Sequence, residues 1–423
     1  MTRAADRPEQ TSDRSAPPTS RRSRFSALRS RNFRLFLLGQ AVATTGLWVQ
    51  RIAQDWLVLS LTGDATAVGV TTALQWAPTL VFGLAAGWIA DRYPKRRVLQ
   101  ATQVAAAAMA ALLAALTLTH QVTAWHVQLV AAGLGTVAAI DWPVRLAFVT
   151  ELVERDQMHS AISLNASTFQ LGGFVGPAVS GVLVGAVGPG WAFAVNAACY
   201  VAPFLALARI DPDQIPHPVR RAAEFAPGGL RRLARRPEIW RPITVAGVFS
   251  MFALNLPVTL AAYAGTARTG PLGYALLTAT AAVGSIIGGL IAAGRTRTTL
   301  RGLTRTGYAL AGAYLLAAAM PTPWSLMCAL TAVGIATQQM YTAANATLQL
   351  TAGQTLRGRV MGAYLLVIMG CGAVGGPLLG MIAQHLGPRA GLAVAGVVPA
   401  AVLLLLSLAR LARRAIGPGL GEP

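Results

Sequence analysis

The sequence predicts an all-α integral membrane protein in which twelve transmembrane helices form two six-helix halves, the second repeating the first in the same direction. Composition is the first reason: 54% of the 423 residues are hydrophobic and 12% are charged, whereas about 25% are charged in soluble domains. The second reason is that apolar segments of about 20 residues, enough for a helix to cross a bilayer, recur along the chain. The third is that motifs of the first half return in the second half, 200 or 201 residues later.

The elements follow in order. Residues 1–32 are polar and rich in arginine, serine and proline, which predicts a disordered cytoplasmic tail. We expect an N-terminal half at 33–208, with spans near 34–61, 68–90, 98–119, 125–149, 160–186 and 190–208. Arginines and prolines predict a cytoplasmic central loop at 209–238. We expect a C-terminal half at 239–412 and a cytoplasmic tail at 413–423, with spans near 240–264, 271–293, 302–320, 323–349, 359–385 and 390–411.

The internal repeat rests on two pairs of segments. Gly176-Pro177 in the fifth span matches Gly376-Pro377 in the eleventh, and 129–133 matches 330–334. Six spans repeated in the same direction indicate a duplication about an axis along the membrane normal. Transporters use this architecture to place a binding site between two moving halves.

The basic residues predict the orientation. A net charge of +20 would suit a nucleic-acid ligand, but the arginines lie in short segments between apolar runs, so we expect no nucleic-acid partner. With the amino terminus inside, the inner segments hold 31 basic residues, and the outer loops hold only Arg268 and Arg389. Because positive charge accumulates on the cytoplasmic side, the sequence predicts a multi-pass protein of the plasma membrane with both termini cytoplasmic.

Residues 87–99 read Gly-Trp-Ile-Ala-Asp-Arg-Tyr-Pro-Lys-Arg-Arg-Val-Leu. This segment resembles the signature that the major facilitator superfamily carries between its second and third spans, with Pro94 in place of a glycine. The resemblance implies that the motif latches the two halves on the cytoplasmic side when the transporter opens outward, and that this role falls on Gly87, Asp91, Arg92 and Arg96. The alternative is a basic loop that only anchors the topology.

Residues 172–181 read Gly-Gly-Phe-Val-Gly-Pro-Ala-Val-Ser-Gly. They resemble the antiporter motif of the fifth span in the same superfamily, which marks exporters that work by exchange. The matching residues are Gly172, Gly176, Pro177 and Gly181, and Ser180 replaces a glycine. A kink that serves packing alone is the alternative. The segment 48–63 is most similar to the bacterial branch of drug and siderophore exporters.

Small residues spaced four apart mark four spans, two in each half. They are Gly83 and Gly87, Gly172 with Gly176 and Ser180, Gly284 and Gly288, and Gly372 with Gly376 and Gly380. Such stripes allow helices to approach closely in a membrane. We expect sliding contacts between the halves, with static packing inside each half as the alternative.

Two pairs of charges lie inside predicted spans, where an unpaired charge costs a few kcal/mol. Arg51 and Asp55 are four residues apart in the first span, and Asp141 and Arg145 are four apart in the fourth. Each acid is a candidate proton carrier, or half of a permanent ion pair that lines a vestibule or gate. The fourth-span motif of proton-coupled exporters is absent, because Leu129 and Ala132 stand where it has arginine and glutamine.

Other polar span residues are candidates for the lining of a central cavity. They are Gln75, Asn165, Gln170, Asn255, Gln338, Gln339, Tyr341 and Asn345, with aromatic walls from Trp76, Trp142, Phe252 and Tyr364. Aromatic and amide groups with few charges suit large amphipathic molecules. Interhelical hydrogen bonding is the alternative role for each of them.

The chain has neither a phosphate-binding loop nor a catalytic constellation, so we expect no enzyme activity, no use of ATP, no cofactor and no metal. The sequence predicts a proton-coupled exporter of amphipathic small molecules that works by alternating access as a monomer in the lipid bilayer. Two alternatives remain open: an uptake transporter or facilitator, and a membrane binding or assembly protein without transport.

Overall fold

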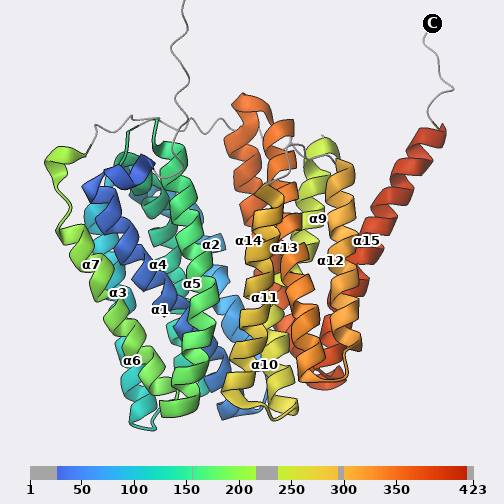
Figure 1. The fold of residues 1–423 in the computed structure, drawn as a ribbon, viewed down its shortest axis with the longest axis horizontal. Coiled ribbons are helices and arrows are strands. Elements are labelled where there is room, and N and C mark those ends of the chain that lie inside the picture. Colours follow the sequence, from blue (N-terminus) through green and yellow to red (C-terminus); the bar gives the residue numbers. More distant parts are fainter. Residues whose placement is uncertain (1–25, 155, 216–236, 294–299, 417–423) are drawn as a thin grey trace, which may run out of the picture.

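The computed structural model describes residues 26–154, 156–215, 237–293 and 300–416, and these form helices with no strand among them. The helices form two groups side by side (Figure 1). The N-terminal group consists of α1 Arg31–Thr62, α2 Ala65–Arg92, α3 Lys95–Leu118, α4 Ala124–Glu151, α5 Met158–Val187, α6 Pro189–Cys199 and α7 Val201–Ala208. The C-terminal group consists of α9 Pro237–Ala253, α10 Leu256–Thr266, α11 Gly270–Ala293, α12 Leu300–Ala319, α13 Pro323–Thr351, α14 Gly353–Leu386 and α15 Pro388–Ile416. Every span expected from the sequence coincides with one helix or one pair of consecutive helices.

Eight helical segments of the described chain are long and apolar enough to cross a membrane. They lie in α3, α4, α5, α6 with α7, α9 with α10, α11, α14 and α15. At 32 residues, α1 is longer than any of these segments, but it buries several polar side chains. They are Gln40, Gln50, Gln54 and Asp55. A helix with so many buried polar groups is expected to face other helices and a polar site rather than lipid.

Two of the spans are broken by proline. Pro257 leaves the carbonyl of Ala253 without its helical donor, and α9 ends at that residue, before α10 begins at Leu256. Pro203 likewise frees the carbonyl of Cys199, where α6 ends. Each of these two spans is therefore a pair of consecutive helices.

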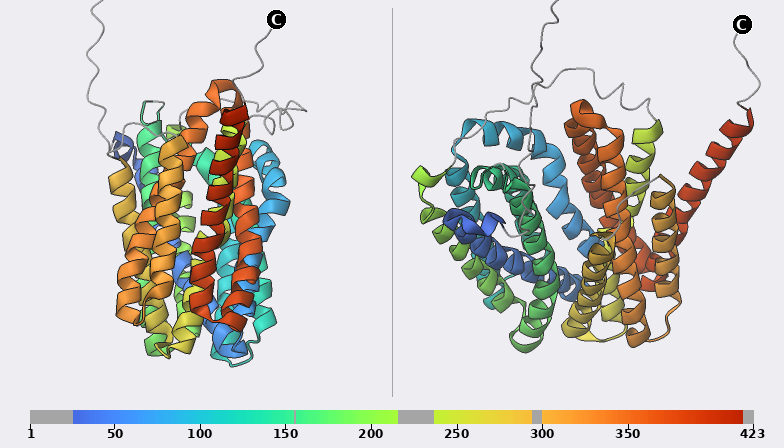
Figure 2. Two further views of the ribbon diagram at one scale, coloured as in Figure 1. Left: turned by 90° about the vertical axis from the view of Figure 1, so that its right-hand side faces the viewer. Right: turned by 45° about the horizontal axis from the view of Figure 1, so that its top comes forward.

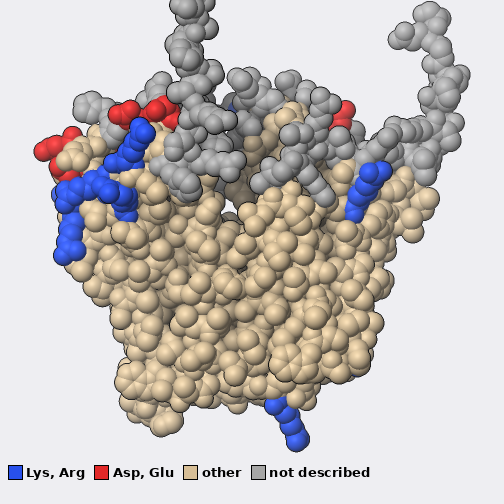
Figure 3. All heavy atoms as spheres, in the orientation of Figure 1, with Lys and Arg blue, Asp and Glu red and all other residues tan. Residues whose placement is uncertain are grey.

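Both ends of the described chain lie at the same end of the molecule, which we call the terminal end; the opposite end is the distal end (Figure 1). Charged side chains gather at the terminal end, and the sides of the molecule between the two ends show none in this view (Figure 3). Exposed Leu, Val, Ile and Trp side chains cover the helix surfaces. This surface suits a protein surrounded by lipid.

The two groups pack against each other at the distal end and diverge toward the terminal end (Figure 2). A Cβ atom built on Gly376 of α14 would lie 2.5 Å from the carbonyl oxygen of Gly69 on α2, so the two backbones almost touch. Nearby, the first backbone N–H of α2, on Ala65, donates to Gln384 of α14 over 2.8 Å. In the terminal half of α2, a Cβ atom on Gly83 would meet nothing within 4 Å.

The residues just before α1 belong to the helical body, which differs from the predicted tail at 1–32. Ser26–Arg29 form a short 3-10 helix, and the buried Ala27 donates its N–H to Ser160 over 3.3 Å. Ser30 then caps α1 by accepting from the N–H of Phe33. Residues 413–416 of the predicted C-terminal tail continue α15. The rest of the predicted tails, residues 1–25 and 417–423, and most of the central loop lie outside the described residues.

Candidate functional site

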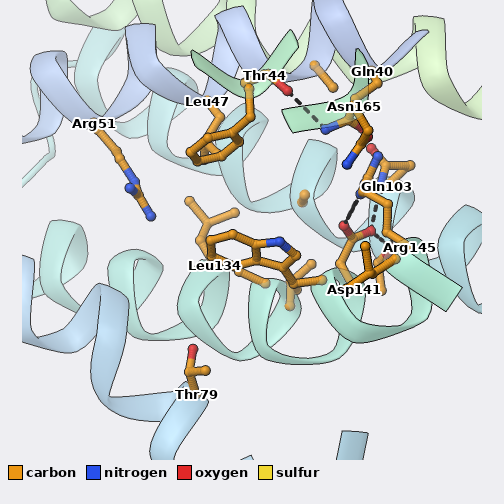
Figure 4. A pocket seen from close by; sticks show the side chains of 18 of the residues that line it. Gln40, Thr44, Leu47, Arg51, Thr79, Gln103, Leu134, Asp141, Arg145 and Asn165 are labelled. Carbon is orange, nitrogen blue, oxygen red and sulfur yellow. Dashed lines mark hydrogen bonds and ion pairs between the residues drawn. The ribbon is translucent and has the colours of Figure 1, made fainter. Parts of the chain in front are cut away.

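A cavity of about 480 Å³ lies inside the N-terminal group, bounded by α1 to α5 and Tyr200 (Figure 4). One side chain of the C-terminal group, Gln338 of α13, also lines it. Six of the residues predicted to line a cavity do so: Gln75, Trp76, Trp142, Asn165, Gln170 and Gln338. The expected site between the two halves is therefore displaced toward the N-terminal group in this structure.

The Asp141 carboxylate is held by three side chains at one end of the cavity (Figure 4). Its Oδ2 accepts from Nε of Arg145 at 2.7 Å, which forms the ion pair expected from their spacing. Its Oδ1 accepts from Thr102 at 2.6 Å and from Gln103 at 3.0 Å. The side chains of Asp141 and Arg145 are only 15% and 11% exposed, so this charge pair is largely buried and well satisfied.

Thr102 and Gln103 were not predicted as site residues. The signal was present in the sequence, since these are two adjacent polar residues at the start of an alanine-rich span. An alanine-rich helix needs no polar side chains for packing. Their place beside Asp141 identifies them as its donors.

Arg51 does not pair with Asp55 as expected from their spacing: the described residues contain no ion pair between them within 4 Å. Instead, the Arg51 guanidinium lies 4.6 Å from the ring centroid of Trp76 and 5.4 Å from that of Trp48. Its side chain points into the cavity (Figure 4). The reason is tertiary, because the aromatic face offered by α2 attracts the cation toward the cavity.

Asp55 is turned toward the other helix group and is 4% exposed. The hydroxyl of Tyr274 on α11 donates to its Oδ2 over 2.8 Å. Its Oδ1 has no hydrogen-bond partner among the described residues. Trp56 stacks on the Tyr274 ring with centroids 6.5 Å apart, so this carboxyl group is sealed into the contact between the groups.

Several amide groups at the cavity have unused hydrogen-bonding capacity. The side-chain oxygens of Gln40, Gln103 and Asn165 are buried and accept no hydrogen bond within the described chain. Gln170 of α5 donates to Gln338 of α13 over 3.3 Å, which links the two groups across the cavity.

Six residues predicted to line the cavity are not among its lining residues: Asn255, Gln339, Tyr341, Asn345, Phe252 and Tyr364. The last two are buried in the hydrophobic core instead. Asn255 is fully buried and donates to the carbonyls of Met251 and Gly372, both over 2.8 Å. It thereby fastens the break between α9 and α10 to α14. Asn345 accepts from Gln349 one turn later on the same helix.

The motif at 87–99 makes only contacts within its own group among the residues that can be described. Arg96 donates to the carbonyl of Ala208 over 2.7 Å, and the Arg92 guanidinium lies 5.6 Å from the Trp88 ring. A Cβ atom on Gly87 would meet nothing within 4 Å. The side chain of Asp91 lies outside the described part of the chain. The latch role of the motif stays a prediction.

The glycine stripes serve mainly packing within a group, so the expectation of contacts between the halves is wrong for most of them. Gly172 and Gly176 face Thr44 and Trp48 of α1, and Ser180 donates to the carbonyl of Val49 over 2.9 Å. Gly284 and Gly288 face α13, and Gly372 faces Leu254. Contacts between the groups are made by Gly376 and Gly380, and by Gly181, which faces Ala275 of α11.

Comparison with known proteins gives a family match over almost the whole chain. A family model described as "transmembrane secretion effector" matches residues 22–416. Over 172 residues the chain is 28% identical to the staphyloferrin A transporter of Staphylococcus aureus, but this match covers only 40% of the chain and 41% of that protein.

Two further relatives match over most of their length. The multidrug efflux pump Tap of Mycolicibacterium fortuitum is 28% identical over 397 residues, which cover 88% of this chain and 93% of the pump. The enterobactin exporter EntS of Shigella flexneri is 25% identical over 396 residues, which cover 90% and 92%. A bacterial homologue of the human lysosomal transporter Spinster, in an inward-facing and occupied conformation, has a similar fold, with a TM-score of 0.69, 15% identity and coverage of 90% and 97%.

Proposed function

The chain belongs to the transmembrane secretion effector family of the major facilitator superfamily, and on that premise we propose that it exports amphipathic small molecules, such as drugs or siderophores, in exchange for protons. It is a membrane transporter and not an enzyme. One observation supports the direction of transport: the matches to an efflux pump and to an exporter extend over 88% and 90% of the chain.

The transport cycle that we propose is alternating access by two six-span halves, residues 33–208 and 239–412. The 31 basic residues of the predicted inner segments assign the terminal end to the cytoplasm. The distal contacts of α2 with α14 and of α5 with α11 would then close the outer side. On this assignment, the structure corresponds to an inward-open state.

Asp55 is the better candidate for the coupling acid. Asp141 already accepts from three side chains, whereas Asp55 accepts from Tyr274 alone and keeps one buried oxygen without a partner in the described chain. A proton on Asp55 would remove a buried charge at the contact between the two groups. Binding and release of the proton would therefore alter this contact, which opens and closes during transport. The membrane potential contributes about 2.3 kcal/mol per proton per 100 mV to uphill export.

The test uses inverted membrane vesicles that contain the protein and are acidified inside. Uptake of a panel of lipophilic dyes, antibiotics and siderophores is followed, with Asp55→Asn and Asp141→Asn as variants. We expect uptake to collapse with a protonophore and in Asp55→Asn, while Asp141→Asn keeps its response to the gradient. Uptake that ignores the gradient would contradict proton exchange, and no uptake by folded protein would contradict export.

A further inference from the structure

The charges that line the cavity do not cancel. Two arginines and one aspartate line it: Arg51, Arg145 and Asp141. The Arg145 guanidinium is neutralised by Asp141 at 2.5 Å. Arg51 therefore leaves the lining with one positive charge in excess.

Arg51 has no acceptor for its N–H groups among the described residues. Its close neighbours are the faces of Trp76 and Trp48, and a cation–π contact with a ring face uses no hydrogen-bond acceptor. Asp55, one helical turn away, accepts a hydrogen bond from Tyr274 and forms no ion pair with Arg51 in the described chain. A cation with free donors inside a membrane protein is costly unless a partner of opposite charge joins it. An anion that enters the cavity would supply this partner.

The walls of the cavity suit a flat, aromatic molecule. Trp142 and Phe169 stack with ring centroids 5.6 Å apart, and Trp76 lies under Arg51. Leu47 and Leu134 add apolar surface between the Arg51 and Asp141 regions (Figure 4). Flat aromatic molecules gain from such stacking in addition to the burial of apolar surface.

The end of the cavity opposite Arg51 offers acceptors. The unpartnered side-chain oxygens of Gln40, Gln103 and Asn165 lie near the Asp141–Arg145 pair, apart from Arg51 (Figure 4). Buried acceptors without partners favour a ligand that brings hydroxyl or amine donors to them.

We propose that the cavity binds aromatic monoanions, with Arg51 holding the anionic group and the amide oxygens of Gln40, Gln103 and Asn165 accepting from donors at the other end of the molecule. This assignment of a substrate class rests on the proposed transport function. Arg51 is then the residue that selects anionic over neutral substrates, because a guanidinium binds carboxylate and sulfonate groups with charge-assisted hydrogen bonds.

The test is an equilibrium binding measurement on the full-length protein in phosphatidylcholine nanodiscs, which contain no anionic lipid to compete for Arg51. Two fluorescent probes differ only by one charged group: anilinonaphthalene sulfonate and the neutral phenylnaphthylamine. We expect the wild-type protein to bind the sulfonate more tightly. Arg51→Gln should weaken sulfonate binding about 10- to 100-fold, as expected for the loss of a hydrogen-bonded charge, and leave phenylnaphthylamine binding unchanged. Arg51→Lys should retain part of the preference.

Arg268→Gln is the matched control, because Arg268 lies in the distal connection between α10 and α11, outside the cavity. It should bind both probes as the wild type does. An equal effect of Arg51→Gln on both probes, no effect on either, or a folded wild type that does not bind the sulfonate would overturn the proposal. This assay measures binding without a proton gradient, so it is independent of the transport test. A protein that binds the probes with this selectivity but does not transport would contradict the proposed export and support the binding site.

Discussion

The hydroxyl of Tyr274 joins the two helix groups by donating to Asp55 across the distal contact. Tyr274→Phe removes this donor, which contributes about 1–3 kcal/mol in a buried site, so we expect the distal end to open about 5- to 150-fold more often. Spin labels on Thr62 and His385, both exposed at the distal ends of α1 and α14, would report a new population of longer distances. The background would lack Cys199, Cys328 and Cys371, which are free thiols.

Tyr314→Phe is the matched control for this measurement. The Tyr314 hydroxyl is also buried, but it has no hydrogen-bond partner in the described chain. Its removal should leave the label distances unchanged. If Tyr274→Phe behaved in the same way, the hydroxyl–carboxyl bond would not be what holds the distal contact.

The Asp141–Arg145 pair is predicted to matter for stability more than for coupling. Arg145→Gln leaves a largely buried carboxylate without its cation, and Asp141→Asn leaves the cation alone, so each should lower the free energy of unfolding by about 2–4 kcal/mol. The double variant should recover a large part of the loss, because neither charge remains. Thermal unfolding in detergent measures all four proteins. Additive losses would show that the two charges act independently.

The two charge pairs also show what can be read from spacing. Asp141 and Arg145 meet because residues four apart share a helix face and no stronger partner competes. Arg51 and Asp55 have the same spacing, but Trp76 of α2 attracts the arginine and Tyr274 of α11 binds the acid. Those partners come from distant parts of the chain, so the outcome could not be predicted from local sequence.

At the scale of elements, α2 carries glycines in two different environments. Gly69 touches α14, and Gly83 faces open space. Gly376→Ala would push a methyl group against the Gly69 carbonyl, so we expect it to open the distal contact. Gly83→Ala should be neutral or stabilise α2 by up to about 1 kcal/mol through helix propensity. The alkylation rate of a cysteine at Ala262, buried in the distal contact, is the measurement.

Faster alkylation is expected for Gly376→Ala alone. Equal rates in the two variants would mean that the approach of α2 to α14 does not set the closure of the distal end. The comparison is well matched, because both substitutions add one methyl group to a glycine inside a long helix.

The positions of the helices were predictable because hydropathy and length are local properties of the sequence. The break between α9 and α10 is local too, because it lies at Pro257. The helix that packs against each glycine stripe was not predictable. A small residue indicates that another helix is close, but it does not indicate which helix. Asn255 illustrates the same limit. A polar side chain in a span can line a cavity, or it can donate to a backbone carbonyl that has no helical donor, and the sequence does not distinguish the two roles. In the structure, Asn255 lies at the break between α9 and α10 and donates to the backbone carbonyls of Met251 and Gly372, so it does not line the cavity.

For the molecule as a whole, the cavity and the distal contact between the groups are separate, although Gln170 and Gln338 join the groups across the cavity. The cavity lies inside the N-terminal group, and the closed distal contact involves α2 with α14 and α5 with α11. Binding and conformational change can therefore be disturbed independently. This separation gives alternating access a direct test.

Ala65 of α2 and Ala383 of α14 are buried together in one distal cluster with Ala262. A disulfide between Ala65→Cys and Ala383→Cys, in the background without native cysteines, should fix the distal end closed. We expect oxidation to stop dye uptake into inverted vesicles, and a reductant to restore it, while probe binding to the cavity persists because the cross-link lies outside it. Each single cysteine variant should transport normally under oxidation. Continued transport by fully cross-linked protein would rule out the proposed movement of the two halves, since no substrate could then reach the distal side.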